Sequence, residues 1–234
     1  MEDDKAQLRT ALRVLWADLW PVGEADLPLR PPEFVGCNKA AELLRRQPAY
    51  QKASVLAVMA DPALLQVRIN ALQDGKTLIA ATPGLKQGLV RITPQGMPLP
   101  RRSRELRGGA LFQAGKPLRL PQARLKKVDL VVGTALASDP QGLLLGDGRG
   151  LLDLLVAVLQ HIEALPSAPA VVALLAEQQL YSDNVPQNPW DQGADVVITP
   201  RQTVYFNQPV RPMLSLSELP SGLKQLPIVK ALLA

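Results

Sequence analysis

Apolar residues recur along the 234-residue chain with helical spacing in four segments. The first, residues 3–20, ends before a proline and carries an apolar stripe formed by Leu8, Leu12, Leu15, Trp16 and Leu19. The other three segments cover residues 36–47, 62–74 and 150–164. Within the second of these three, we expect the inward-facing residues to be Leu65, Ile69 and Leu72. Helical turns are also predicted around Pro227.

Short and almost entirely apolar segments lie between these helices, which is typical of strands buried on both faces. They cover residues 53–60, 76–82, 128–133 and 168–176. Residues 194–199 and 203–206 have the pattern of a short hairpin. Because strands alternate with helices, the pattern predicts an α/β protein with a mostly parallel sheet covered by helices on both faces. The chain has neither an internal repeat nor a long linker, so we expect residues 1–234 to form one domain.

Composition adds the kind of core and the expected compartment. Hydrophobic residues make up 47% of the chain and aromatic residues only 4%, so the core must be largely aliphatic. No apolar run approaches the ~20 residues of a membrane helix, and the charged start lacks the apolar region of a secretory leader. The single cysteine, Cys37, excludes an internal disulfide and suits a reducing compartment. We therefore expect a cytoplasmic protein without membrane contact. With one cysteine and one histidine, His161, a zinc cluster is excluded.

The net charge of +5 is concentrated in one segment. Residues 101–127 carry nine arginines and lysines against a single acid, Glu105, together with several glycines and prolines. Their composition predicts that residues from about 93 to 127 form a flexible basic loop rather than a helix. Such a loop could be solvated, could cover a polyanionic ligand, or could bind nucleic acid. The segment has one aromatic residue, Phe112, which gives little support for base stacking.

The stretch GLLLGDGRGLLDLL, residues 142–155, places three glycines directly before a predicted helix. Its spacing is neither the G-x-G-x-x-G of dinucleotide sites nor a Walker A loop. Glycines at a helix N-terminus nevertheless allow an anion to approach backbone N–H groups. Asp153, in the first helical turn, could hold Mg²⁺ beside a phosphate. The alternative is a glycine-rich turn with a solvated Asp153.

The stretch VDLVVGTALASDPQGLLLGDGRGLLDLL, residues 128–155, resembles the signature of the 5-formyltetrahydrofolate cyclo-ligase (methenyltetrahydrofolate synthetase) family. The order and spacing match at Val128-Asp129-Leu130, at Gly142, and from Leu145 to Asp153. Two further pairs agree, Lys5 with Arg9 on the first helix and Asp191 with Asp195 before VVITP. Segments such as FVGCNKAAELL and LPIVKALLA are most similar to the branch of methenyltetrahydrofolate synthase domain-containing paralogues. The resemblance implies a three-layer α/β/α, Rossmann-like fold of the cyclo-ligase/NagB-RpiA-CoA-transferase type.

The resemblance also implies a chemistry, in which ATP and Mg²⁺ convert 5-formyltetrahydrofolate into 5,10-methenyltetrahydrofolate. Phosphate-binding residues would be Lys5, Arg9, Gly146, Asp147, Gly148, Arg149 and Gly150. The Mg²⁺ ligands would be Asp153 and Asp191. Weaker candidates for substrate contact are Arg68, Asn70 and Trp190, which could instead be surface or packing residues.

The sequence departs from the family pattern around the glycines. The family's arginine before them is Leu144 here, its two tyrosines are Leu151 and Leu152, and the arginine after its aspartate is Leu154. The family's substrate-binding acid has no evident equivalent after Pro62. Arg149 could replace one lost charge and is the candidate catalytic residue.

Three functions stay open. The first is an ATP-dependent cyclo-ligase, and the second a non-catalytic paralogue that binds a nucleotide, a folate, another phosphorylated compound or a partner. The paralogue branch carries an implied connection with thiamin metabolism. The third is an RNA binder that uses residues 101–127.

Overall fold

The computed structural model describes residues 2–20, 30–120, 125, 127–166, 169–212, 215–219 and 221–233. Within these residues the main sheet has eight strands in the order β10-β9-β8-β5-β1-β2-β3-β4. The strands that pair in parallel are β1 (Val55–Val58), β2 (Thr77–Ala81), β5 (Leu130–Gly133), β8 (Ala170–Leu174) and β9 (Val196–Ile198). Antiparallel pairs at the two edges add β3 (Leu89–Ile92), β4 (Lys116–Pro117) and β10 (Thr203–Tyr205). A small separate sheet pairs β6 (Ala137–Ser138) with β7 (Leu144–Leu145).

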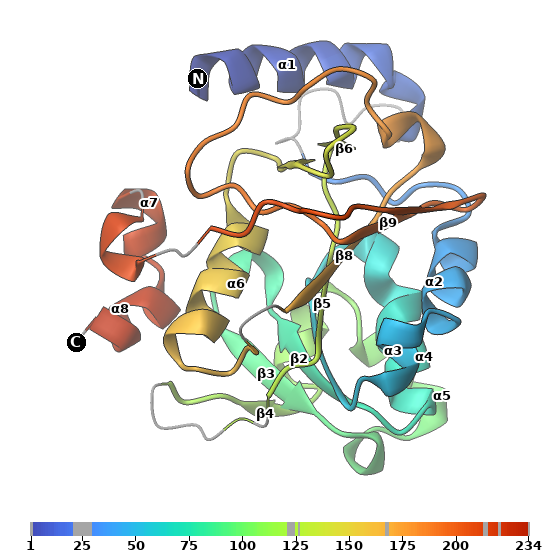
Figure 1. Ribbon diagram of the computed structural model, residues 1–234. Helices are drawn as coiled ribbons and strands as arrows, with labels where there is room; N and C mark the ends of the chain where they lie inside the picture. Colours follow the sequence, from blue (N-terminus) through green and yellow to red (C-terminus); the bar gives the residue numbers. More distant parts are fainter. Residues whose placement is uncertain are drawn as a thin grey trace.

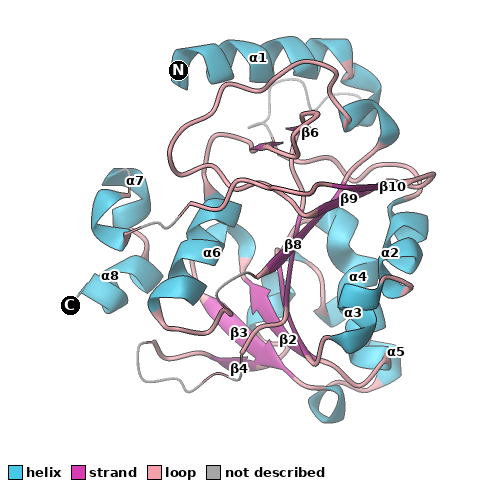
Figure 2. Ribbon diagram, in the orientation of Figure 1, coloured by secondary structure: helices cyan, strands magenta, loops and turns pink. Residues whose placement is uncertain are grey.

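Helices cover both faces of this sheet, as the sequence pattern predicts (Figures 1 and 2). On one side lie α2 (Cys37–Arg45), α3 (Pro48–Lys52), α4 (Leu65–Gln73) and α5 (Leu99–Glu105). On the other side lie α6 (Leu151–His161), α7 (Ser221–Lys224) and α8 (Pro227–Leu233). The first helix, α1 (Glu2–Leu15), crosses one end of the molecule and is followed by the short helix η1 (Ala17–Leu19). The expected α/β architecture with a mostly parallel sheet is confirmed. None of the helices in the described ranges has the length and apolar character needed to cross a membrane.

The central strands are apolar on both faces because both faces are covered. Every residue of β1 and β5 is buried. Gly133 in β5 lets α6 approach closely, since a Cβ at this position would lie 2.9 Å from Leu152 Cδ1. Leu152 is thereby packed onto the sheet.

The strand order creates a crevice at the carboxyl ends of β1 and β5. From β1 the chain continues to β2 on one side, and it later places β5 on the other side. Ligands of open α/β sheets bind where the order reverses in this way. Asp61 lies just after β1 and Thr134 just after β5, and the Thr134 hydroxyl donates a 2.9 Å hydrogen bond to Asp61 Oδ2. The loops that follow β1 and β5 are thus hydrogen-bonded to each other across the crevice.

The predicted apolar faces need two corrections. Leu15 is 69% exposed although it shares the stripe with the buried Leu12, because α1 ends there and the chain turns into η1. In α4 the predicted inward residues Leu65 and Ile69 are only partly buried. Both the sheet and α2 pack against α4, so its buried positions extend around the helix and its amphipathic pattern is weak.

The basic segment contains a helix that its composition did not predict. Leu99–Glu105 form α5, with prolines only at its start, where the missing N–H is tolerated. Arg102 is buried and donates a 2.9 Å hydrogen bond to the Met97 carbonyl, and Arg101 pairs with Glu105 one turn later. Arg124 and Lys126 lie outside the described residues. RNA binding by this segment stays a prediction, and Arg102 is excluded from the solvated set.

Candidate functional site

A cavity of about 790 Å³ lies between α1, the glycine loop of residues 146–150, the segment before β9, and α7. Most residues predicted for the site line it, although they come from opposite ends of the chain: Lys5, Arg9, Gly146, Gly148, Arg149, Gly150, Asp153, Trp190 and Asp191. Asp147 lines a small adjoining cavity. Trp190 is 37% exposed at the cavity wall. Two sequence motifs separated by more than 100 residues therefore form one site.

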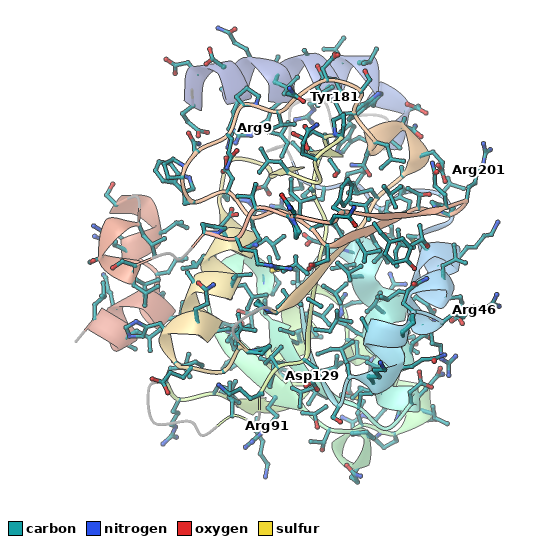
Figure 3. The ribbon with its side chains drawn as sticks, in the orientation of Figure 1. Arg9, Arg46, Arg91, Asp129, Tyr181 and Arg201 are labelled. Atoms are coloured by element: carbon teal, nitrogen blue, oxygen red, sulfur yellow. The ribbon has the colours of Figure 1, made fainter. Side chains whose placement is uncertain are left out.

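Arg9 joins the first helix to the glycine loop. Its Nε donates a 2.9 Å hydrogen bond to the Gly146 carbonyl, and its Nη1 donates a 2.8 Å hydrogen bond to Glu2 Oε1. Figure 3 shows Arg9 beneath α1, on the side that faces the rest of the molecule. Gly148 has φ +90°, and a Cβ there would lie 3.4 Å from the Arg9 guanidinium carbon. The loop therefore carries a cation held against bare backbone, a suitable arrangement for an anionic ligand.

The three glycines of the loop differ in backbone conformation and in their surroundings. Gly148 and Gly150 adopt positive φ values of 90° and 61°, which side chains rarely tolerate. Gly146 has no such φ, and a Cβ built on it meets no described atom within 4 Å. Neither backbone conformation nor packing requires glycine at position 146. Because Gly146 lines the cavity, its missing side chain leaves open space there.

Lys5 forms a buried ion pair with Asp191 at the same cavity. Lys5 is 2% exposed and Asp191 7%, and the backbone N–H of Asn188 also donates to this carboxylate. Asn188 in turn donates a 3.1 Å hydrogen bond to Glu2 Oε2. The pair therefore fixes α1 against the segment before β9 and places one cation and one carboxylate at the cavity.

Asp153 supplies a second carboxylate. Its Oδ1 accepts a 2.8 Å hydrogen bond from the Gln192 backbone N–H. Burial raises the pKa of Asp153 to about 6; the Gln192 hydrogen bond opposes this shift, and the charge of Asp191 adds to it. Among the described residues no group of three metal-ligating side chains occurs. Mg²⁺ is commonly held by one or two carboxylates, completed by phosphate oxygens and water, so Asp153 and Asp191 suit an ion that enters with a phosphorylated ligand.

Arg149 lies where this cavity meets a second one of about 510 Å³. Its Nε donates a 2.8 Å hydrogen bond to Asp147 Oδ2, and its backbone N–H donates to Oδ1 of the same residue. The second cavity shares Gly84, Arg149 and Leu151 with the first and continues toward Arg13 and Trp20. Two neighbouring compartments thus meet at Arg149 and Leu151.

Asp61 is an acid of the second cavity that the sequence analysis missed. Burial raises its pKa, the Thr134 hydroxyl stabilises the charged form, and the charge of Arg68 also favours that form. The family pattern places its acid after Pro62, whereas Asp61 directly precedes this proline. An acid immediately after a buried parallel strand would have been the signal, because the carboxyl ends of such strands bind ligands.

Lys86 is another cavity residue that was missed. It follows Gly84 and Leu85, which have φ values of +63° and +55°. A positive φ at a buried leucine is uncommon, and such conformations cluster at ligand sites. The turn thereby brings Lys86 to the cavity that residues of α7 also line.

Comparison with known proteins identifies the family. A sequence model of the 5-formyltetrahydrofolate cyclo-ligase family matches residues 2–200. The chain belongs to this family. Its relatives include methenyltetrahydrofolate synthase domain-containing proteins of Bos taurus, 29% identical over 201 residues, and Homo sapiens, 27% identical over 201 residues. Each alignment covers 81% of this chain and 51% of the relative, so the chain spans about half the length of these proteins.

The fold comparison agrees with the family assignment. The 5,10-methenyltetrahydrofolate synthetase of Aquifex aeolicus matches with a TM-score of 0.54 and 17% identity, over 90% of this chain and 96% of that one. At this identity the likeness concerns the fold alone. The predicted resemblance to the cyclo-ligase family and the predicted fold class are both confirmed.

Three of the four leucines that depart from the family pattern line cavities, and the fourth lies in the core. Leu144, Leu151 and Leu152 line the cavities. Leu152 also packs on Gly133, and Leu154 is completely buried in the core. An arginine at position 154 of this cyclo-ligase relative would therefore meet the core, whereas Leu144, Leu151 and Leu152 change the lining of the cavities.

Arg68 and Asn70 are buried rather than surface residues, and neither lines the cavities. The Arg68 Nη1 donates to the carbonyls of Met59, at 2.6 Å, and Asp61, at 3.2 Å. Asn70 donates a 2.7 Å hydrogen bond to Glu42 Oε1. Arg68 therefore holds the backbone that presents Asp61, and the structure gives no support for substrate contact by either residue.

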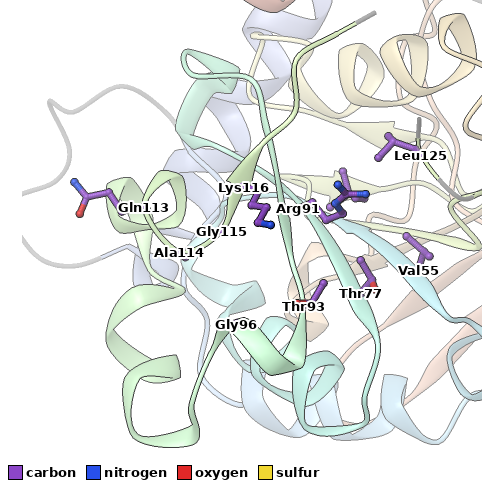
Figure 4. Close-up of a pocket in the computed structure, with 11 residues that line it drawn as sticks. Val55, Thr77, Arg91, Thr93, Gly96, Gln113, Ala114, Gly115, Lys116 and Leu125 are labelled. Atoms are coloured by element: carbon purple, nitrogen blue, oxygen red, sulfur yellow. The ribbon is translucent and has the colours of Figure 1, made fainter. Parts of the chain in front are cut away.

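A further cavity of about 540 Å³ lies away from all of these residues (Figure 4). It includes Val55 and Thr77, the first residues of β1 and β2. It therefore lies at the amino ends of these parallel strands, whereas the crevice lies at their carboxyl ends. Arg91 and Lys116, paired across β3 and β4, contribute its charge. Figure 3 places Arg9 and Arg91 at opposite ends of the molecule. None of the residues predicted for the site lines this cavity.

Proposed function

We propose that this chain binds ATP with Mg²⁺ in the 790 Å³ cavity and a folate in the adjoining 510 Å³ cavity, as an ATP-dependent cyclo-ligase of its family. The observation that carries the proposal is the contact of Arg9 with the glycine loop beside Gly146, where no described atom fills the place of a side chain. Family membership supports the folate part of the proposal.

The residues of the first cavity would each make a different contact with a polyphosphate. Arg9 and the backbone N–H groups of residues 146–150 would bind phosphate oxygens. Asp153 and Asp191 would hold Mg²⁺, and Lys5 would limit the repulsion between these carboxylates and the phosphates. ATP would supply the phosphoryl group that activates the formyl oxygen. Positioning and charge neutralisation dominate catalysis of phosphoryl transfer, and these residues provide both.

Arg149 and Asp61 would act at the junction and in the second cavity. Arg149 lies where the two compartments meet, so its guanidinium would face charge that develops between a phosphate and the folate. Asp61, held by Thr134 and by the Arg68-bound backbone, would accept hydrogen bonds from N–H groups of the folate ring. Leu151 would separate both ligands from water.

The lining of the cavity also favours a second candidate function. Leu144 and Leu151 replace an arginine and a tyrosine of the family pattern at cavity positions. A site without these groups would bind the same ligands but would close no ring. This candidate is a non-catalytic ligand-binding paralogue.

One assay separates the two candidates. Purified protein is mixed with 5-formyltetrahydrofolate, ATP and Mg²⁺, and absorbance of the methenyl product is followed, with an authentic cyclo-ligase as the positive control. ATP-dependent formation of product supports the enzyme. Calorimetric binding of both ligands without product supports the non-catalytic paralogue, and binding of neither contradicts the proposal. Thiamin phosphates are tested in parallel as ligands, because the resemblance to the paralogue branch implies a connection with thiamin metabolism.

A further inference from the structure

The C-terminal helices complete the cavity although they lie beyond the family match. That match ends at residue 200, whereas Leu219, Gly222, Leu223 and Leu226 all line the 790 Å³ cavity. They belong to or flank the short helix α7, which lies beside α6 in Figure 1. The phosphate-binding half of the site thus comes from the family core, and the facing wall comes from a segment outside it.

The two walls of the cavity differ in chemistry. One wall carries the charged side chains of Lys5, Arg9, Asp153 and Asp191. The C-terminal wall contributes three leucines and a glycine, and Leu151 continues this apolar surface from α6. Leu223 lies against the glycine loop, because a Cβ on Gly150 would be 3.4 Å from Leu223 Cδ1. An apolar surface therefore begins immediately beside the loop that would hold phosphate.

Gly222 points to what this wall receives. Gly222 is the exposed second residue of the four-residue helix α7. Its φ is not positive, and a Cβ built on it meets no described atom within 4 Å. As at Gly146, neither backbone conformation nor packing requires glycine here. The two glycines with open space beside this cavity lie on opposite walls, one in the phosphate loop and one among the leucines.

We infer that Leu219, Gly222, Leu223 and Leu226 form the subsite for a flat, uncharged ring of the phosphorylated ligand. The bare face of Gly222 lets a ring lie against the helix backbone, and the leucines bury its edges. The ligand class is a phosphate ester or anhydride that carries an aromatic heterocycle, as a nucleotide does, in preference to an inorganic polyphosphate. This inference rests on the proposed function, because it concerns the same cavity.

The test compares two ligands that share the phosphate chain and differ in the ring. Calorimetry measures the affinity of the full chain for ATP and for tripolyphosphate, both with Mg²⁺. Gly222→Phe places a side chain in the space assigned to the ring, and Gly109→Phe is its control at another open glycine outside the cavity. We expect Gly222→Phe to weaken ATP binding about tenfold, the value of roughly 60 Å² of buried ring surface. Tripolyphosphate binding should not change, and Gly109→Phe should affect neither ligand.

Leu223→Ala provides a second variant that shortens the wall instead of filling it. It should also weaken ATP binding selectively, and circular dichroism with thermal unfolding verifies that each variant is folded. If the wild type binds both ligands and neither variant discriminates between them, the subsite is wrong while the proposed function stands. If the wild type binds neither ligand, the proposed function fails and the subsite with it.

Discussion

The Arg9 guanidinium donates a 2.9 Å hydrogen bond to the carbonyl of Gly146, a residue 137 positions later in the chain. This contact places a cation from the first helix directly on the glycine loop. It also leaves the open side of Gly146 facing the cavity. The proposed phosphate site depends on this arrangement, and the first prediction follows from it.

Substitution of the loop glycines should separate stability from binding. Gly146→Ala introduces no strained φ and no clash, so its free energy of unfolding should stay within about 0.5 kcal/mol of the wild type. Its affinity for ATP with Mg²⁺ should fall, because the new methyl group occupies ligand space. Gly148→Ala, at φ +90°, should lose about 1 kcal/mol or more of stability. Urea unfolding and calorimetry measure the two effects, and a marked destabilisation by Gly146→Ala would show that the fold itself requires this glycine.

The buried pair of Lys5 and Asp191 should show strong coupling. Lys5→Met leaves a buried carboxylate without its cation and should cost roughly 3–5 kcal/mol. The double variant Lys5→Met with Asp191→Asn removes the orphaned charge and should recover part of this loss. A double-mutant cycle by urea unfolding measures the coupling. Simple additivity of the two single effects would contradict the described ion pair.

The ionised form of Asp153 should lower the free energy of unfolding at neutral pH. Its pKa is about 6 in the folded protein against an ordinary value of 3.8, so the folded state binds its proton more tightly. The free energy of unfolding therefore falls as pH rises from about 4 to above 6, by a total of about 3 kcal/mol from this group. Asp153→Asn carries no such charge and should be more stable than the wild type at pH 7.5, with the gain disappearing near pH 4. Equal stability changes at pH 7.5 and pH 4 would contradict the raised pKa of Asp153.

The two cavities should respond to different substitutions. Asp61→Asn replaces an acceptor in the second cavity and should weaken binding of 5-formyltetrahydrofolate about tenfold, the value of one charge-assisted hydrogen bond. Its affinity for ATP should not change. Arg9→Ala should have the reverse selectivity, because Arg9 lines only the first cavity of the two. Calorimetry with each ligand separately measures both variants, and loss of both ligands in either variant would contradict the assignment of one ligand to each cavity.

The parts of the site that could be predicted from sequence are those with a local signature. The glycine loop, Asp153, and the spacing of Lys5 and Arg9 on one helix face are short patterns, and the structure brings them to one cavity. Their binding roles stay predictions. Asp61 was missed because the family pattern places the expected acid on the other side of Pro62.

Other features depend on tertiary packing, which local patterns in the sequence do not indicate. Arg68 and Asn70 are polar residues in a helix with a weak amphipathic pattern, and the pattern does not indicate that α2 and the sheet enclose α4 from both sides. The four-residue helix α7 is too short for periodicity to indicate its face. Its position at a cavity that residues of α1 also line depends on tertiary packing. The antiparallel edge strand β4 was missed for the same reason, since it has only two residues.

The central claim is that Arg9 and the glycine loop bind the phosphates of ATP with Mg²⁺. Titration calorimetry of ATP with Mg²⁺ into the wild type and into Arg9→Ala tests it most directly. The account predicts saturable binding of one ATP per chain and an affinity at least about tenfold weaker in Arg9→Ala, the value of a lost charge-assisted hydrogen bond. Absence of ATP binding by the wild type, or an unchanged affinity in a folded Arg9→Ala protein, would contradict it.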